Sequence, residues 1–134
     1  MTLNTVDALV QLSFRIQRLL GDVGAGHDMS IVQMRLLGIL RDRTVGMLEL
    51  GQYLGLDKSS MTGLVTRAEK RGLVARAPSP HDGRAVLVSL TPLGQRLTEA
   101  GTAEVGRRID ALIAGLTAEE RAAITDLAAR IVHS

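Results

Sequence analysis

The sequence lacks cysteine and tryptophan altogether and contains one phenylalanine and one tyrosine in 134 residues. Without cysteine the chain forms no disulfide and no thiolate metal site, and it cannot sense oxidants through a thiol. Because Phe14 and Tyr53 are its only such aromatic residues, it also lacks the stacking platforms with which many proteins bind single-stranded DNA or RNA. The composition therefore argues against a redox sensor and against a single-strand binder.

Signals for membranes and secretion are missing as well. No apolar run approaches the roughly 18 residues that a membrane span needs. The N-terminus, MTLNTVDALVQLSFRIQRLL, has neither the basic region nor the small-residue cleavage site of a signal peptide. We therefore expect a cytoplasmic protein that does not interact with membranes.

Catalytic and metal-binding patterns are equally scarce. His27, His81 and His133 are isolated, and no pair of carboxylates accompanies any of them. The chain has no nucleophile elbow and no glycine-rich phosphate loop. A metal sensor would need cysteines or clustered histidines. We expect no enzyme activity, no cofactor and no metal site.

The charged residues are unevenly distributed, although the net charge is only +2. Between Lys58 and Arg84 six basic residues stand against two acidic ones, whereas the rest of the chain has ten basic and twelve acidic residues. One fifth of the chain therefore carries a charge of +4 and the remainder −2. Such a concentration of positive charge is typical of a surface that faces a polyanion.

Apolar residues recur at helical spacing over most of the chain, which contains no internal repeat. The pattern predicts helices over residues 5–20, 30–42, 47–55, 57–72, 91–115 and from 117 onward. Three glycines in GDVGAGHD should end the first helix. Side chains that can cap a helix N-terminus precede four of the others, namely Ser30, Asp57, Thr91 and Thr117. Gln33 and Glu120 complete capping boxes with the first and the last of these.

Between the fourth and fifth helices the period changes. LVAR (73–76) and AVLVSL (85–90) alternate as short strands do, around an eight-residue loop rich in turn-forming residues. Two short helices joined by a tight turn and followed by a hairpin describe a winged helix-turn-helix. The expected fold is mainly α with a small β-hairpin wing, and N- and C-terminal dimerisation helices flank the winged domain.

The helix that follows Asp57 has two different faces. Met61, Leu64, Val65 and Ala68 share one side and should face the core. The other side carries small hydroxyls and cations that suit a DNA major groove: Lys58, Ser59, Ser60, Thr62, Gly63, Thr66, Arg67 and Lys70. A solvated helix face has a similar pattern, so the assignment to DNA depends on the hairpin.

The hairpin ends in HDGR, which has no apolar residue to bury. A single cation on a stiff ribbon suits the narrow, electronegative minor groove of DNA. We expect Arg84 to make that contact, with His81 and Asp82 beside it. Asp82 has three interpretations: it holds the Arg84 guanidinium, it pairs with Arg67, or it only forms the turn.

These segments together resemble the multiple antibiotic resistance regulator (MarR) family of winged-helix transcription factors. The resemblance rests on SIVQMRLLGIL, LELGQYLGLDKSSMTGLVTRAEKRGLVAR and SPHDGRAVLVSLTPLG, and the order of elements matches over essentially the whole chain. The last segment contains the family's wing pattern in Asp82, Arg84, Leu90, Thr91 and Gly94. The resemblance implies that the helix from Lys58 reads the major groove, that Arg84 reads the minor groove, and that the first and last helices form a two-fold dimer.

The chain departs from the family pattern at four positions. Gly63 stands where a larger polar or basic residue is common, and Thr66 where an acidic residue is common, so the base sequence that this helix reads is open. Gly63 in a helix interior also costs about 1 kcal/mol relative to alanine. Gly51 replaces the usual alanine and Gly46 a more usual threonine cap, and both are tolerable.

The resemblance also implies a small, often anionic or aromatic, ligand in a cleft between the dimer helices and the DNA-binding domain. Candidate ligand-pocket residues are Arg15, Arg18, His27 and Arg35, although each fits a surface or structural role as well. The sequence does not identify the ligand.

Three parts are expected: an N-terminal dimerisation helix (1–28), a winged helix-turn-helix DNA-binding domain (29–90) and C-terminal dimerisation helices (91–134). The apolar stripes of the terminal parts either cover the domain's own core or form a homodimer on a pseudo-palindromic operator, and we favour the dimer. The expected function is a sequence-specific regulator of transcription, a repressor that binds double-stranded DNA and is released by a small molecule. The alternative is a non-enzymatic module that docks another protein, but a docking wing should carry apolar anchors, and HDGR has none.

Overall fold

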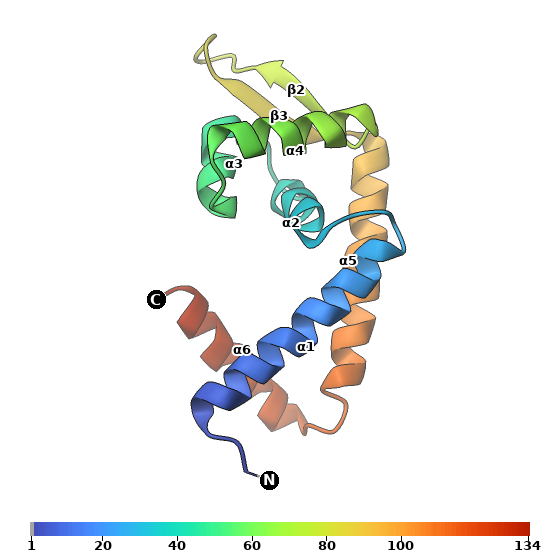
Figure 1. Ribbon diagram of the computed structural model, residues 1–134, viewed down its shortest axis with the longest axis vertical. Coiled ribbons are helices and arrows are strands. Elements are labelled where there is room, and N and C mark those ends of the chain that lie inside the picture. The colour runs from blue at the N-terminus through green and yellow to red at the C-terminus, as the bar shows by residue number, and fades with distance from the viewer. Residues whose placement is uncertain (1) are drawn as a thin grey trace.

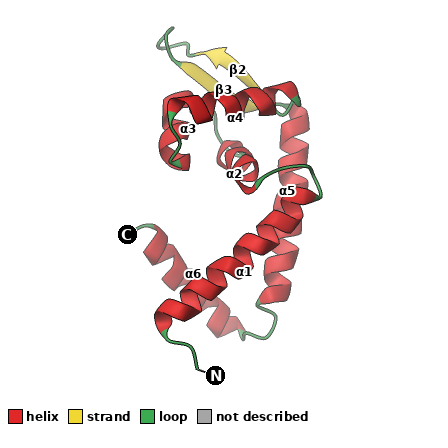
Figure 2. Ribbon diagram, viewed as in Figure 1, coloured by secondary structure: helices red, strands yellow, loops and turns green. Residues whose placement is uncertain are grey.

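The computed structural model describes residues 2–134, so Met1, the first residue of the expected N-terminal part, lies outside it. Within that range the elements follow in the order α1 (Thr5–Ala25), α2 (Ile31–Leu40), β1 (Val45–Gly46), α3 (Met47–Leu54), α4 (Lys58–Lys70), β2 (Val74–Pro78), β3 (Val86–Leu90), α5 (Pro92–Leu112) and α6 (Ala118–Val132). The three strands form one antiparallel sheet in the order β1-β3-β2. Figure 2 shows how small the strand content is beside the helices. The expected mainly helical fold with a small β-sheet is confirmed.

The wing and helix α6 lie at opposite ends of the molecule (Figure 1). The β2–β3 hairpin and α4 are at one end, whereas α6 and both chain termini are at the other. Helix α5 runs from the sheet toward α6, and α1 packs against α2 and α5. A surface on α4 and the hairpin is thereby far from a surface on α6.

The predicted caps start four of the helices. The Ser30 hydroxyl accepts a hydrogen bond from the Gln33 amide at 3.1 Å, and the Gln33 side chain accepts one from the Ser30 amide at 2.8 Å. Thr117 and Glu120 form the same reciprocal pair at the start of α6. Asp57 and Thr91 cap α4 and α5 through their side-chain oxygens. Each cap satisfies amides that have no partner inside the helix.

Helix α1 is five residues longer than predicted, because the glycines of GDVGAGHD do not end it at Leu20. Val23 and Gly24 are buried inside the extended helix. A Cβ at Gly24 would collide with the backbone oxygen of Met29, whose amide donates to the Gly24 carbonyl at 2.8 Å. The glycine therefore allows a close approach of the chain inside the helix, and the helix ends only after Ala25.

Strand β1 is not predicted from the sequence. It has two residues, and its partners are distant in the sequence: Val45 pairs with Val88 and Gly46 with Leu87. The hairpin is also longer than predicted on one side, since β2 continues to Pro78, opposite Val86. β3 is therefore the central strand of the sheet, with β1 paired on one of its edges and β2 on the other.

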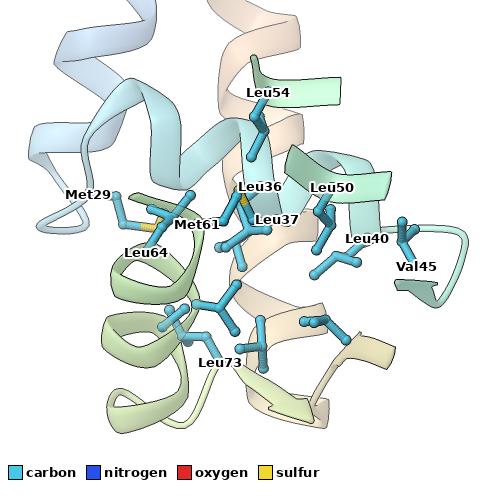
Figure 3. Close-up of a cluster of buried hydrophobic side chains, with 14 residues drawn as sticks. Met29, Leu36, Leu37, Leu40, Val45, Leu50, Leu54, Met61, Leu64 and Leu73 are labelled. Carbon is cyan, nitrogen blue, oxygen red and sulfur yellow. The ribbon is translucent and has the colours of Figure 1, made fainter. Parts of the chain in front are cut away.

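One hydrophobic core lies beneath α4 (Figure 3). Leu36 and Leu37 of α2, Leu50 of α3 and Met61 of α4 meet there, together with residues of the three strands. Because α2, α3 and the sheet all contact the apolar face of α4, the opposite face of that helix is fixed toward solvent. The core thus determines which side chains α4 presents outside.

The start of α5 explains the glycine of the wing pattern. A Cβ at Gly94 would collide with the carbonyl oxygen of Leu73 at the beginning of the hairpin. That carbonyl accepts a hydrogen bond from the Thr91 amide at 3.1 Å, and the Thr91 hydroxyl donates to the carbonyl of Gly72. Only glycine permits this contact, which attaches α5 directly to the winged domain.

Candidate nucleic-acid interface

Helix α4 presents the eight predicted DNA-contacting residues on one face. Met61, Leu64, Val65 and Ala68 are buried in the core. The predicted contact residues are exposed or half-buried on the opposite side: Lys58, Ser59, Ser60, Thr62, Gly63, Thr66, Arg67 and Lys70. The arrangement places short side chains in the first half of the helix and cations at its start and end, which suits a helix that approaches a major groove closely.

A carboxylate of the protein itself, that of Asp57, caps the start of α4. The Asp57 carboxylate accepts a hydrogen bond from the Ser60 amide at 2.7 Å. Hydrogen bonds from the backbone and side chain of Ser60 lower the pKa of Asp57 below its ordinary value. The Ser60 amide is therefore occupied in the free protein, and a DNA phosphate at this helix end would have to share the site with a carboxylate.

The hydroxyl of Thr62 points its proton back at the helix, donating to the Lys58 carbonyl at 2.8 Å. Toward solvent it can then offer only an acceptor. In a major groove such an acceptor suits the amino group of adenine or cytosine.

Gly63 and Arg67 are coupled. A Cβ on Gly63 would lie 3.1 Å from the Nη1 atom of Arg67, so the guanidinium extends over the space that a side chain at position 63 would fill. In this arrangement the cation of Arg67 covers the middle of the recognition face, where the residue type departs from the family pattern.

Thr66 has a partner within the protein. Nη2 of Arg76, on strand β2, donates to the Thr66 hydroxyl, and Nε of Arg76 lies 3.4 Å from Oε1 of Glu69. That Nε is buried without a hydrogen bond, so the Glu69 contact is an attraction of charges only. Thr66, a predicted recognition residue, thus also connects α4 to the wing. In the sequence Arg76 is only one of six basic residues of the positive segment, and its contact with Thr66 is not predicted.

The hairpin tip is a loop of seven residues (79–85) with Arg84 exposed on it. The Asp82 carboxylate accepts a hydrogen bond from the Arg84 amide at 3.0 Å. In the part of the chain that the structure describes, Asp82 forms no ion pair with Arg84 or Arg67, so of the three interpretations the turn-forming one fits the structure. The amides of His81 and Asp82 donate to the Ser79 hydroxyl, which shapes the loop on which Arg84 is exposed.

A cavity of about 270 Å³ lies between α1, α2 and α5. Of the four candidate ligand residues it brings together His27 and Arg35, whereas Arg15 and Arg18 are not among its lining residues. Arg35 donates to the backbone oxygen of Tyr53 at 3.0 Å, and His27 Nε2 lies 3.5 Å from Oε2 of Glu104. The rest of the lining is largely apolar, from Leu20 on α1 to Val105 on α5.

The terminal helices leave apolar side chains in water. Val6 and Phe14 of α1 are 69% and 63% exposed, and Ile131 and Val132 of α6 are 63% and 76% exposed. Helix α6 buries no residue in the described chain. Exposed apolar surface of this extent in one region marks an interaction site.

Other kinds of site find no support in residues 2–134. No group of three or more histidines, aspartates or glutamates is arranged to hold a metal ion there. None of the helices in this range combines the length and the apolar character that crossing a bilayer requires.

Comparison with known sequences gives two kinds of match. A sequence model of the MarR family matches residues 27–85. FarR, an HTH-type transcriptional regulator of Neisseria gonorrhoeae, is 34% identical over 100 residues, which cover 74% of this chain and 68% of FarR. The multiple antibiotic resistance protein MarR of Escherichia coli (strain K12) is 31% identical over 117 residues, which cover 86% of this chain and 81% of MarR.

Solved structures agree with this similarity. Wild-type MarR from E. coli without ligand superposes with a TM-score of 0.83 at 27% identity, covering 98% of both chains. A mutant MarR complexed with operator DNA gives a TM-score of 0.77 at 28% identity, covering 93% of this chain and 91% of that one. NadR in complex with 4-hydroxyphenylacetate gives 0.79 at 27% identity, covering 97% of this chain and 93% of NadR.

Proposed function

Because the chain belongs to the MarR family of winged-helix transcriptional regulators, we propose that it is a repressor that binds double-stranded DNA sequence-specifically. It acts as a homodimer on a pseudo-palindromic operator, with residues 29–90 on the DNA and residues 1–28 and 91–134 in the dimer. A small molecule in the cavity between α1, α2 and α5 releases it.

The observation that carries the DNA-binding proposal is the exposed polar face of α4 beside the cationic wing tip. The core fixes this face outward, and Arg84 lies at the tip of the β2–β3 hairpin, whose strand β3 also pairs with β1. A helix of this kind enters a major groove while a wing reaches the adjacent minor groove. The operator complex of MarR, a protein with the same fold, supports the assignment.

The dimer proposal rests on the exposed apolar residues of α1 and α6. A two-fold axis through these helices would bury them against a second copy. It would also set two α4 helices side by side on one face of DNA, about 34 Å apart, which is one turn of the double helix. The operator should therefore contain two half-sites.

The ligand proposal rests on the cavity lined by His27 and Arg35. Its volume of about 270 Å³ suits a small molecule of one ring, and its apolar wall with a few polar groups at the edge is typical of ligand sites. The complex of NadR with 4-hydroxyphenylacetate supports a small aromatic ligand in this fold. Arg15 and Arg18 do not line this cavity, so the ligand contacts proposed are those of His27 and Arg35.

Selection of bound duplexes from a randomised DNA library, followed by footprinting at two salt concentrations, tests the DNA-binding proposal. We expect a pseudo-palindrome with protection over two half-sites, and affinity that falls steeply with salt as phosphate contacts release counterions. Salt-sensitive binding without any selected sequence would contradict the proposal. It would favour the alternative in which the winged dimer docks another protein.

A cavity-filling pair of variants tests the ligand proposal. A Cβ at Gly101, which lines the cavity, meets no atom within 4 Å, and the same is true at Gly106 farther along α5. We expect 4-hydroxyphenylacetate or a related aromatic acid to release wild-type protein and Gly106→Val from the selected duplex, but not Gly101→Val. Equal release of all three proteins would place the ligand elsewhere.

A further inference from the structure

The loop between α1 and α2 is held from two sides by charged side chains. On one side, Nη1 of Arg71 donates to the Asp28 carbonyl and Nη2 to the His27 carbonyl, both at 2.9 Å. On the other side, His27 Nε2 lies 3.5 Å from Oε2 of Glu104 on α5. Three segments that are far apart in the sequence therefore meet at two consecutive residues.

Arg71 is the residue that ends the recognition helix. Its amide donates to the carbonyls of Arg67 and Glu69, and Gly72 follows with a φ of 74°, in the left-handed region. The guanidinium of Arg71 thus connects the last turn of α4 directly to the loop. Lys70, its neighbour, forms no such contact among the described residues.

The loop that Arg71 holds is conformationally strained. Asp28 has a φ of 54°, and it is the one non-glycine residue with a positive φ in residues 2–134. Such a conformation persists only where surrounding contacts stabilise it. The carbonyl oxygens of His27 and Asp28 accept the two hydrogen bonds from Arg71 in the direction that this conformation gives them, so loop and guanidinium stabilise each other.

The same loop forms part of the cavity wall. His27 and Met29 line the cavity between α1, α2 and α5. Glu104, which faces His27, also pairs with Arg108 at 3.1 Å. A change in the position of α5 or in the contents of the cavity would act on His27, whose carbonyl is bound to the end of α4.

We propose that Arg71 is a positioning residue for DNA recognition, which fixes the C-terminal end of α4 against the loop at His27 and Asp28. Glu104 fixes the same loop against α5, so that the loop connects the dimer helix and the cavity to the recognition helix. The proposal rests on the DNA-binding function proposed above. Arg71 does not contact DNA in this assignment; it acts through the orientation of the residues on α4.

The competing assignment for Arg71 is a phosphate contact, because it lies in the positive segment beside Lys70. The salt dependence of binding separates the two. Removal of a phosphate contact flattens the slope of log affinity against log salt by about one unit. Removal of a positioning residue lowers the affinity and leaves the slope unchanged, because the number of phosphates contacted stays the same.

The experiment uses full-length variants and the duplex selected by the wild-type protein. We expect Arg71→Ala to weaken binding about tenfold, equivalent to about 1.4 kcal/mol, with an unchanged salt slope. Lys70→Ala, the matched control, should flatten the slope by about one unit. Arg71→Lys keeps the charge but replaces the planar guanidinium, whose two Nη atoms each donate to one carbonyl, with a single nitrogen, and it should resemble Arg71→Ala. Flattening of the slope in Arg71→Ala, or full affinity in Arg71→Lys, would overturn the proposal.

A double-mutant cycle tests the connection through the loop. Glu104→Gln removes the charge that faces His27, and within residues 2–134 no hydrogen bond or ion pair joins Glu104 to Arg71 directly. The losses of operator affinity in Arg71→Ala and Glu104→Gln should be less than additive when combined, because either change releases the same loop. Additive losses would show that the two residues act separately.

Amide hydrogen exchange in the absence of DNA keeps this inference distinct from the proposed function. In Arg71→Ala the amides of residues 26–29 and of the last turn of α4 should exchange faster than in wild-type protein, while those of α6 should not change. If wild-type protein selects no DNA sequence, the proposed function fails, and with it the role of Arg71 in recognition. If wild-type protein binds its operator and exchange at residues 26–29 is unaltered in Arg71→Ala, only the present inference fails. Thermal unfolding identifies a variant that has lost its fold, in which case Arg71→Lys provides the comparison.

Discussion

The two ends of the molecule present opposite kinds of surface. At the wing end the exposed side chains of α4 and the hairpin tip are hydroxyls and cations, and the apolar residues of α4 are buried. At the terminal end, α6 buries nothing and leaves Ile131 and Val132 more than half exposed. Polar residues at the wing end also bind one another, as Arg76 and Thr66 do.

The difference shows which end is complete in a single chain. The winged domain is stabilised by its own hydrophobic core. Its exposed polar and charged side chains are therefore available to bind a polyanion such as DNA. The terminal helices lack such a core, and their apolar residues cost free energy until another surface covers them. A second copy of the chain at one end and DNA at the other would satisfy both.

The largest expected effect is the loss of the dimer on introducing a charge at the terminal end. Leu127 in α6 is 53% exposed in the single chain. A two-fold interface would lose two leucines in Leu127→Asp, each contributing about 1.5–3 kcal/mol, so the dimer should weaken more than a hundredfold. Sedimentation velocity should show a dimer for wild-type protein and a monomer for this variant.

Leu48 provides the control, because it lies on α3 in the winged domain and is 80% exposed. Leu48→Asp adds the same charge at a more exposed leucine and should leave the dimer intact. If both variants dissociate, or neither does, the dimer interface is not confined to the terminal end as proposed.

The second expected effect is at the wing. Arg84→Ala should cost about 1–3 kcal/mol of DNA affinity, because one charged contact in the minor groove is lost. The unfolding temperature should not change, since the Asp82 contact that shapes the loop involves only the backbone amide of residue 84. Titration of the selected duplex measures the loss. Arg130→Ala removes the same charge from α6. An equal loss of DNA affinity in that variant would mean that Arg84 contributes only non-specific electrostatic attraction.

Local patterns were sufficient to predict the helices and most of their ends. Ser30 and Gln33, or Thr117 and Glu120, satisfy each other within three residues of chain, so the sequence contains the whole interaction. Strand β1 could not be predicted in this way because its partner is more than 40 residues away. The end of α1 was predicted wrongly because Gly24 serves a contact with Met29 that the sequence does not reveal.

The candidate site was predictable to a similar extent. Periodicity separates the buried and exposed faces of α4, and HDGR identifies the wing tip. The sequence does not show which arginines turn inward. Arg71 binds backbone carbonyls 43 and 44 residues away, and only its spacing of three from buried Ala68 hints that it faces the domain. Backbone acceptors leave no mark in the sequence, since every residue carries one.

A smaller effect is expected at the middle of the recognition face. Gly63→Ala should stabilise the fold by about 1 kcal/mol, because alanine is the better helix former and the atom it meets is the flexible end of Arg67. The displaced guanidinium should change which base pair is preferred at one position of each half-site. Gly106→Ala on α5 should give a similar gain in stability without altering that preference. Thermal unfolding measures the change in stability, and a new round of selection measures the preferred base pair. An unchanged preference in Gly63→Ala would show that Arg67 does not take part in base recognition.

The smallest effect concerns the two kinds of helix cap. At the wing end α4 is capped by a carboxylate, Asp57, whose pKa is lowered by the Ser60 hydrogen bonds, whereas at the terminal end α6 is capped by the neutral hydroxyl of Thr117. Because the folded pKa of Asp57 lies below the unfolded one, its contribution to stability is present above about pH 4 and is lost as the pH falls through the folded value. Asp57→Asn keeps an oxygen acceptor for the Ser60 amide but does not titrate, so its unfolding temperature should fall less than that of wild-type protein between pH 6 and pH 3. Thr117→Asn should leave the acid dependence as it is in wild-type protein. If Asp57→Asn follows the wild-type curve throughout, the acid sensitivity of the fold originates elsewhere, and the carboxylate at the start of α4 contributes no charge-dependent stability.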